Sequence, residues 1–343
     1  NVYIHSDFSH LNIQKINVAI IANAARDHES IIEKSLQAGI DVLVEKPATL
    51  SYTSTAKLVK LANIKNILFS SAHIFLFARY TDNFSRLVTN SKQIKSIYVI
   101  WTDPKVEKRY GENKQYDQGL PIIYDWLPHI LSIISTFTKN SPITGINVDL
   151  CKGGSYVKIK FLLGNIFCKL KLVRNDKIRR REFKVTTNQL LKLDFSKEPG
   201  VMHEGEKTIC ADEKWDVEER PAAQMITTFL NQAITGHIDN RLNIDIALRA
   251  NKFIDNVAIF YNQALLSWLK TRLLSQTLID IDLNYALSEI IFFKGHNPPN
   301  IEICIKNIKQ AFNGVDAQKW QDKFSKSKKP FNVIRSSSRI KPH

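Results

Sequence analysis

The sequence predicts a doubly wound parallel α/β domain followed by an α+β domain with a large, mostly antiparallel sheet. Between residues 15 and 90, short uninterrupted apolar segments alternate with helical patterns, as in a parallel sheet buried on both faces. Beyond about residue 95, β-rich segments follow one another directly and are separated by turn residues such as Gly164-Asn165 and Asn175-Asp176. The change from the first pattern to the second indicates two domains of different class.

Length and composition agree with a globular protein. The 343 residues are enough for two domains, and 44% hydrophobic and 24% charged residues are ordinary values. No apolar run reaches the roughly 18 residues that a membrane-spanning helix needs. The four cysteines are far apart, so we expect reduced thiols in a cytoplasmic protein, with neither a disulfide framework nor a metal site.

The first domain is expected within residues 1–93. Its elements alternate between strand and helix, and right-handed crossovers then give a parallel sheet. Gly39 closes the first helix at the position where glycine commonly ends helices. The predicted elements are, in order, Val18–Ala22, His28–Ala38, Val42–Val44, Ser51–Asn63 and Ile67–Ser70.

The second domain is expected within residues 94–270. A polar loop, Thr102–Gln118, and an irregular segment, Gly200–Trp215, interrupt its elements. Residues 271–343 are expected to form a helical appendage with a disordered basic tail. The predicted strands are Ser96–Trp101, Gly145–Leu150, Val157–Leu163, Ile166–Val173, Arg181–Val185 and Leu190–Phe195, and the predicted helices are Asp125–Phe137, Pro221–Ile234 and Leu242–Leu269.

Three side chains are candidates for chemistry. Lys46 lies at the carboxyl end of a predicted parallel strand, where open α/β sheets bind ligands, and Pro47 restricts its backbone. Asp125 and His129 are four residues apart and share one face of a helix, with Asp125 able to cap it and Pro128 in its first turn. Histidine is the usual general acid or base near neutral pH. A surface lysine, a capping aspartate and a structural histidine are the alternative interpretation.

The stretch "VAIIANAARDHESIIEKSLQAGIDVLVEKPATLS" resembles the glucose–fructose oxidoreductase/inositol dehydrogenase/MocA (Gfo/Idh/MocA) family. The similarity rests on His28 at the helix start, Ala38-Gly39 at its end, and Glu45-Lys46-Pro47 after the strand. The later "DWLPHILSII" resembles the family's D-x-x-x-H helix. The resemblance covers roughly residues 1–270 and implies a partial Rossmann domain. It departs at Asn23-Ala24, at Ile74 and Leu76, and at Leu127-Pro128.

The resemblance implies an oxidoreductase that uses NAD or NADP and acts on a sugar, a cyclitol or a sugar nucleotide. Lys46 would polarise or orient the reacting group, His129 would exchange the proton, and Asp125 would position the substrate. The resemblance also implies a homo-oligomer assembled through the antiparallel sheet. We expect no nucleic-acid or membrane partner. The implied cofactor-lining residues are Asn23, Ala24, Ala25, His28, Glu45 and His73.

The glycine-rich phosphate loop of such a domain is missing before Val18. We therefore expect the sequence to be a fragment of a longer enzyme, in which Val18–Ala22 has lost a neighbouring strand. The alternative is a non-catalytic relic that keeps the fold for sugar binding or oligomerisation.

The net charge of +15 also permits a nucleic-acid or membrane-surface binder. Because Lys, Ile and Asn are abundant throughout the sequence, general compositional bias is the better explanation. The densest basic clusters are Lys177–Arg181 and Lys326–Lys341, and such runs are usually solvated. Tyr110 and Tyr116, in the polar loop, are candidate substrate contacts by location alone.

Overall fold

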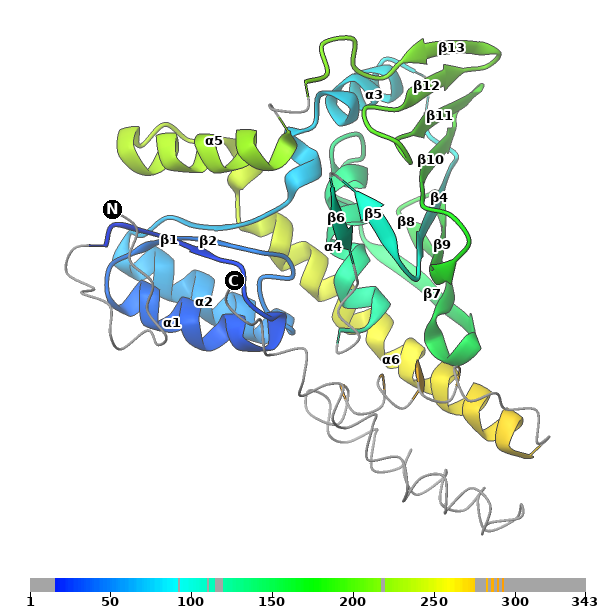
Figure 1. Ribbon diagram of the computed structural model, residues 1–343, viewed down its shortest axis with the longest axis horizontal. Helices are drawn as coiled ribbons and strands as arrows, with labels where there is room; N and C mark the ends of the chain where they lie inside the picture. The colour runs from blue at the N-terminus through cyan, green and yellow to red at the C-terminus, as the bar shows by residue number, and fades with distance from the viewer. Residues whose placement is uncertain are drawn as a thin grey trace. The chain divides into compact units, whose positions relative to one another are not determined.

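The computed structural model describes residues 16–91, 93–109, 111–114, 120–216 and 220–274, together with residues 282, 285, 286, 289 and 292. The chain divides into two compact units. The first unit joins the residues up to Phe77 to those of Val217–Lys252. The second joins Ala78–Asp216 to the residues from Phe253 onward. Each unit is built around its own sheet (Figure 1).

The sheet of the first unit is parallel and has the order β1-β2-β3. Its strands are β1 (Val18–Ile21), β2 (Asp41–Val44) and β3 (Phe69–Ser71). This confirms the parallel α/β class. Among the described residues β1 pairs only with β2, and the Ile20 side chain on β1 is 50% exposed.

Helices cover both faces of this sheet (Figure 1). Val42 and Val44 pack in the cluster that contains α1 (His28–Gln37) and α2 (Tyr52–Lys65). Leu43 points to the other face and packs with Met225 and Phe229 of α5 (Pro221–Thr235). Burial on both faces explains why β2 is apolar at consecutive positions.

Local signals account for the helix ends. The Ser51 side chain accepts a hydrogen bond from the Ser54 N–H and caps α2. Asn66 then ends α2 in the left-handed conformation, with φ +53°. Gly39 also has a positive φ and follows α1, as the sequence predicts.

The second unit contains an eight-stranded sheet with the order β13-β12-β11-β10-β4-β9-β8-β7. All its strand pairs are antiparallel except β4 with β9, which confirms the mostly antiparallel α+β class. The strands are β4 (Ser96–Pro104), β7 (Ile143–Cys151), β8 (Tyr156–Leu163), β9 (Ile166–Asp176), β10 (Arg180–Thr186), β11 (Leu190–Asp194), β12 (Val201–Glu204) and β13 (Lys207–Cys210).

Two segments contain more strand than the sequence suggests. Gly200–Trp215, expected to be irregular, contains the β12–β13 hairpin, which extends the large sheet. A Cβ on Gly200 would lie 2.1 Å from the Asp194 carbonyl oxygen, so this position requires glycine. The expected polar loop after Thr102 contains a small hairpin of β5 (Glu107–Arg109) and β6 (Glu112–Lys114).

Helices cover one face of the large sheet. The described helices of this unit are α3 (Arg79–Thr89), α4 (Ile122–Ser135) and most of α6 (Asp245–Leu274), which starts in the first unit. Phe161 of β8 packs against Phe253 of α6, with ring centroids 4.8 Å apart. Along β8, the residues between the buried ones point to the opposite face and are half-buried or exposed.

Helix α4 begins three residues earlier than predicted. Its N-cap is Pro121, whose carbonyl oxygen accepts from the Tyr124 and Asp125 N–H groups. The expectation that Asp125 caps the helix is therefore wrong, and Pro128 lies inside the helix rather than in its first turn. The reason is that apolar residues Ile122–Tyr124 are buried and extend the helix towards its N-terminus.

The expected appendage and tail, residues 271–343, lie almost entirely outside the described residues, as do Tyr110 and Tyr116. Within the described part of the chain, no helix combines the length and the apolar character needed to cross a membrane.

Candidate functional site

The carboxyl edge of the parallel sheet gathers most of the predicted cofactor residues. Asn23 to Ala25 follow β1, Glu45 and Lys46 follow β2, and His73 follows β3. Asn23 is exposed, whereas Lys46 is half-buried and His73 is only 2% exposed. Because the strands are parallel, these residues lie along one edge of the sheet, which is where ligands bind in such folds.

His28 ties two of these strand ends together. Its Nδ1 lies 2.9 Å from the Pro47 carbonyl oxygen, and its Nε2 lies 3.0 Å from the Asn23 carbonyl oxygen. The side chain is 1% exposed. Both partners are acceptors, so a neutral imidazole donates to one of them at a time and an imidazolium donates to both. His28 is therefore placed as a positioning residue for the loops after β1 and β2.

A second buried network fixes the loop after Pro47. The Asn251 side-chain nitrogen donates to the Thr49 carbonyl oxygen at 3.1 Å and to the Thr55 hydroxyl at 2.7 Å. The two threonine hydroxyls are 2.8 Å apart, and all three residues are buried. Asn251 comes from the start of α6, far along the sequence. Sequence reasoning missed it, because nothing in a single sequence relates an asparagine at position 251 to position 49.

The segment after His73 explains one departure from the family pattern. Residues Ile74–Phe77 form a short 3-10 helix, η4, and Leu76 and Phe77 are buried in the cluster with Met225 and Phe229. The apolar residues at these positions therefore pack under α5. This part of the edge therefore contributes to packing and offers few polar side chains for binding a ligand.

In the second unit, α4 carries Asp125 and His129 one turn apart. The His129 ring stacks on Trp101 of β4, with centroids 6.1 Å apart and an interplanar angle of 14°. His129 is 8% exposed. The indole therefore fixes the plane of the imidazole, which a proton-transferring histidine needs for its geometry.

Asp125 forms a buried ion pair. Its Oδ2 accepts from Arg174 of β9 at 2.8 Å, and the Arg174 side chain is fully buried while that of Asp125 is 18% exposed. Burial lowers the pKa of Arg174, but Tyr285, Asp125 and Glu289 together raise it above its ordinary value. Arg174 also donates to the Leu120 carbonyl oxygen at 2.8 Å. The pair therefore connects α4 to β9, a contact that the sequence does not reveal.

Arg181 also lies over the ring of Trp101. Its guanidinium carbon is 4.3 Å from the centroid of the indole ring, and it donates to the Thr102 carbonyl oxygen and to Asp103 at 2.6 and 2.5 Å. Burial lowers the pKa of Arg181 to about 10, so it remains protonated at neutral pH. The expectation that the Lys177–Arg181 cluster is solvated is therefore wrong for Arg181, whose side chain is 7% exposed.

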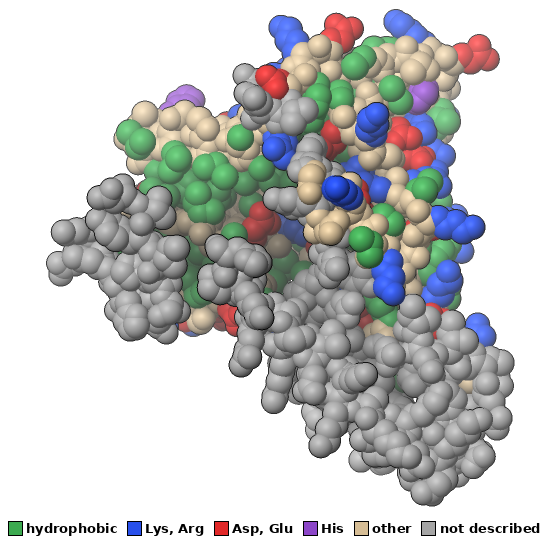
Figure 2. All heavy atoms as spheres, in the orientation of Figure 1, with side chains coloured by type: hydrophobic (Ala, Val, Ile, Leu, Met, Phe, Trp, Pro, Cys, Tyr) green, Lys and Arg blue, Asp and Glu red, His purple; other side chains and the backbone are tan. Residues whose placement is uncertain are grey.

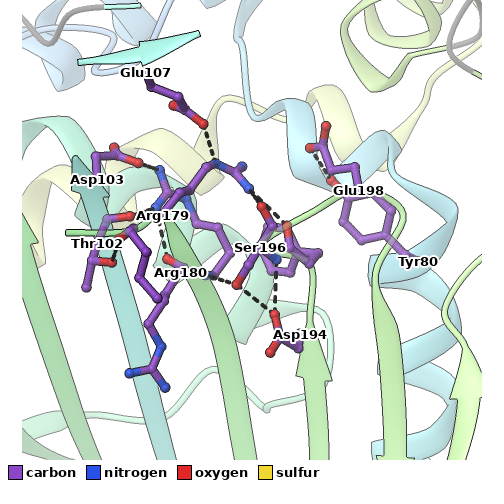
Figure 3. Close-up of polar contacts among 12 residues, drawn as sticks. Tyr80, Thr102, Asp103, Glu107, Arg179, Arg180, Asp194, Ser196 and Glu198 are labelled. Atoms are coloured by element: carbon purple, nitrogen blue, oxygen red, sulfur yellow. Dashed lines mark hydrogen bonds and ion pairs between the residues drawn. The ribbon is translucent and has the colours of Figure 1, made fainter. Parts of the chain in front are cut away.

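A polar cluster lies at the start of β10 and at the ends of β4 and β11 (Figure 3). Arg179 pairs with Glu107 at 3.5 Å and donates to the carbonyl oxygens of Phe195 and Ser196. Nearby, Tyr80 donates to Glu198 at 3.0 Å. The cluster anchors the β5 strand of the polar loop to the large sheet.

The predicted residues thus form two groups, one in each unit. The first group contains Lys46 and the cofactor-edge residues, and the second contains Asp125 and His129. That the two groups meet around one substrate stays a prediction. Within the described residues, no set of three or more His, Cys, Asp or Glu side chains is arranged to hold a metal ion.

One known protein family matches the segment that contains the first group of residues. Residues 3–73 match the model described as "Oxidoreductase family, NAD-binding Rossmann fold" (Gfo/Idh/MocA). Residues 3–73 are therefore similar to the NAD-binding domain of this oxidoreductase family. The match contains the β1–β3 sheet and ends at His73, so the edge described above lies inside the matched segment.

Two curated relatives of the chain are biliverdin reductases. Biliverdin reductase A of Mus musculus is 32% identical over 101 residues, which is 29% of this chain and 34% of the mouse protein. The protein of the same name from Homo sapiens is 31% identical over the same share. The chain therefore spans about a third of the length of the curated relatives that it matches.

Solved structures share the fold of both units. A UDP-N-acetylglucosamine 3-dehydrogenase from Acidithiobacillus ferrooxidans has a TM-score of 0.61 at 17% identity and covers 74% of this chain and 81% of its own. A 3-ketoreductase from Actinomadura kijaniata, in complex with TDP-benzene and NADP, has a TM-score of 0.58 at 15% identity, with 71% and 77% covered. At this identity the similarity is one of fold.

The residues at the edge fit a nicotinamide cofactor. Ala24 and Ala25 are small and half-buried, so the backbone after β1 is open to close approach by a flat group. His28 and the Asn251 network hold the loops on either side in fixed positions. The residues that could hold the cofactor are therefore those after β1 and β2, with Lys46 beside them.

Proposed function

We propose that the protein is an NAD(P)-dependent oxidoreductase that acts on a hydroxyl or carbonyl group of a sugar, a cyclitol or a sugar nucleotide. The observation that carries the proposal is Glu45-Lys46-Pro47 at the carboxyl end of β2, inside the segment that matches the family's NAD-binding domain. Sugar-nucleotide enzymes among the similar structures support the substrate class.

Each residue has a distinct part in this proposal. When bound, the nicotinamide supplies or accepts the hydride. The Lys46 ammonium group polarises the substrate oxygen, and His129, held flat on Trp101, gives or takes the hydroxyl proton. Asp125 is a positioning residue, because its carboxylate binds Arg174 and sets the orientation of the α4 turn that carries His129.

The test is turnover of purified full-length chain with NAD or NADP and a panel of sugars, cyclitols and UDP- or TDP-sugars. We expect Lys46→Ala to lower kcat by about 10²-fold or more while cofactor affinity changes little. Lys60→Ala, an exposed lysine on α2, is the matched control. Likewise His129→Asn should lower kcat strongly, and His237→Asn, which changes an exposed histidine, should not.

A second candidate is the reduction of a linear tetrapyrrole. It is favoured by the 32% identity to biliverdin reductase A, which exceeds the identity to any sugar-nucleotide enzyme above. Adding biliverdin with NADH and NADPH to the panel separates the two candidates. Turnover of biliverdin but of no sugar would replace the first proposal. The roles of Lys46 and His129 would then be tested with the same variants and biliverdin as the substrate.

The third candidate is a non-catalytic protein of the same fold. It predicts that no substrate in the panel is turned over and that Lys46→Ala changes nothing measurable. Calorimetric titration with NAD and NADP then decides whether cofactor binding alone remains.

A further inference from the structure

Arg174 differs from most cations of the molecule because its whole side chain is buried. Lysine and arginine usually lie at the surface, and Figure 2 shows many of those of the second unit there. The Arg174 side chain is fully buried instead, and its Nη2 lies 2.8 Å from Oδ2 of Asp125. The charge of a second acid, Glu289, acts on the same guanidinium group. Two acids therefore share one buried arginine.

Glu289 belongs to a segment that follows α6. The described residues of this segment are helical and are spaced so that they share one face of a helix; they are Asp282, Tyr285, Ala286, Glu289 and Phe292. The Phe292 ring lies 5.1 Å from the Tyr124 ring of α4, measured between centroids. A Cβ on Gly153, in the short 3-10 helix η5 (Lys152–Gly154), would lie 2.1 Å from the Asp282 carbonyl oxygen. The segment is therefore packed closely against the second unit.

Hydrogen bonds connect Glu289 to Arg174 through Tyr285. Arg174 Nη1 donates to the Tyr285 hydroxyl oxygen at 3.2 Å, and the Tyr285 hydroxyl is hydrogen-bonded to the Glu289 carboxyl group. Tyr261 of α6 donates to Glu289 Oε2 at 3.0 Å. A chain of hydrogen bonds therefore leads from Asp125 through the buried Arg174 to the buried Glu289.

The charge of Glu289 changes in the neutral pH range. Burial raises the pKa of Glu289 to about 7, although Arg174 and the hydrogen bonds from Tyr261 and Tyr285 act in the opposite direction. These three groups face Glu289 from β9, from α6 and from its own segment, and Asp125 lies beyond Arg174. A neutral Glu289 leaves the positive charge to Asp125, whereas an ionised Glu289 attracts the same guanidinium group.

We propose that Glu289 competes with Asp125 for the buried Arg174 and thereby sets how firmly the ion pair holds the turn of α4 that carries His129. Glu289 is a positioning residue, because it acts on this turn through Arg174 and Asp125. Its effect on catalysis rests on the proposed function, which places Asp125 and His129 at the active site, whereas the competition for Arg174 does not. Ionisation of Glu289 loosens the hold on Asp125.

Infrared spectroscopy of the complete chain tests the competition. Ordinary carboxyl groups are ionised above about pH 6, so a protonated carboxyl band that titrates between about pH 6 and 8 and is lost in Glu289→Gln belongs to Glu289. Asp125→Asn removes the other negative charge from Arg174. It should lower the midpoint of this titration by at least about one pH unit, a tenfold change in proton affinity. Asp125→Ser replaces this variant if circular dichroism shows misfolding.

The matched control is Asp282→Asn, on the same segment. The Asp282 carboxylate interacts with Lys152 and Arg272, so its loss should leave the midpoint of Glu289 in place. The proposal is overturned if no such band titrates in the wild-type protein, if Asp125→Asn leaves the midpoint unchanged, or if Asp282→Asn shifts it equally.

The pH dependence of kcat tests the effect on the site, with the substrate that the panel above identifies. Glu289→Gln keeps the neutral form at every pH. The ratio of wild-type to variant kcat should therefore fall at least about threefold from about pH 6 to 8, with KM for the cofactor unchanged. A constant ratio would overturn the positioning role even if the infrared midpoint shifts. If the wild-type protein turns over no substrate, the proposed function fails, and the infrared shift by itself decides the competition for Arg174.

Discussion

The strands of the two sheets differ in how many of their faces are buried. In β2, Leu43 and Val44 are adjacent and both buried, because helices cover the sheet on both sides. In β8, Phe161 is 1% exposed while its neighbour Leu162 is 40% exposed, because one side carries no helix. A sheet covered on both faces has only its strand ends for contact with other molecules, whereas a half-covered sheet also has a face. The cofactor edge follows from the first arrangement, and the open face of the large sheet follows from the second.

The largest expected effect separates the two faces of β8. Phe161→Ala should lower the free energy of unfolding by about 3–5 kcal/mol, because it leaves a cavity beside Phe253. Leu162→Ala should cost less than about 1 kcal/mol, because its side chain is partly in water already. Urea titration followed by tryptophan fluorescence measures both, since Trp101 and Trp126 lie in this unit. Equal losses would show that a partner or another segment covers the outer face.

The matched pair in β2 should behave differently. Leu43→Ala should cost about 2–5 kcal/mol and Val44→Ala a smaller but still clear amount, because each leaves a cavity on its own side of the sheet. Urea titration followed by circular dichroism measures the loss in the first unit. A Val44→Ala change without effect would contradict the two-sided burial of this strand.

A medium effect is expected from the ion pair behind His129. Asp125→Ala leaves the fully buried Arg174 without this carboxylate and should destabilise the protein by about 3 kcal/mol. Asp82→Ala removes the exposed pair with Arg86 and should cost less than about 1 kcal/mol. If both changes cost the same, Asp125 does not anchor α4 and its proposed positioning role fails.

The smallest effect concerns the pH dependence of stability at Asp194, the last residue of β11. Burial raises the pKa of Asp194, but hydrogen bonds from Ser196 and Lys192 outweigh it and hold the pKa below its ordinary value of 3.8. A lowered carboxyl pKa stabilises the folded state above that ordinary value, and the contribution is lost as the pH falls through the lower pKa. Asp194→Asn should therefore flatten the acid side of the stability–pH curve. Ser196→Ala should flatten it partly, and a steeper curve would refute the contact.

Much of the fold could be predicted because burial leaves a periodic pattern. Consecutive apolar residues at Val42–Val44 and alternating ones along β8 predict the correct strand type in each unit. Helix α4 starts earlier than the sequence predicts, because the buried residues Ile122–Tyr124 extend it beyond the expected cap at Asp125. The β12–β13 hairpin was missed because its strands are only four residues long. A turn at Gly205, with φ +59°, was its one local signal.

The site could be predicted only where its residues are close in sequence. Glu45-Lys46-Pro47 and His28 belong to one continuous motif, and the structure joins them through His28 and Pro47. Trp101, Arg174 and Asn251 support candidate residues from distant parts of the chain, and no single-sequence pattern connects them. Arg181 looks like part of a surface run, yet alternation in β10 points it inward with Phe183.

His28 has one further consequence. Since a single ring joins the Asn23 and Pro47 carbonyls, the two loops that follow β1 and β2 cannot separate without breaking one of its contacts. A ligand that binds at this edge meets loops that are already ordered, so binding does not carry the entropic cost of ordering them. The shape of this edge is then set before binding by one imidazole that is itself only 1% exposed.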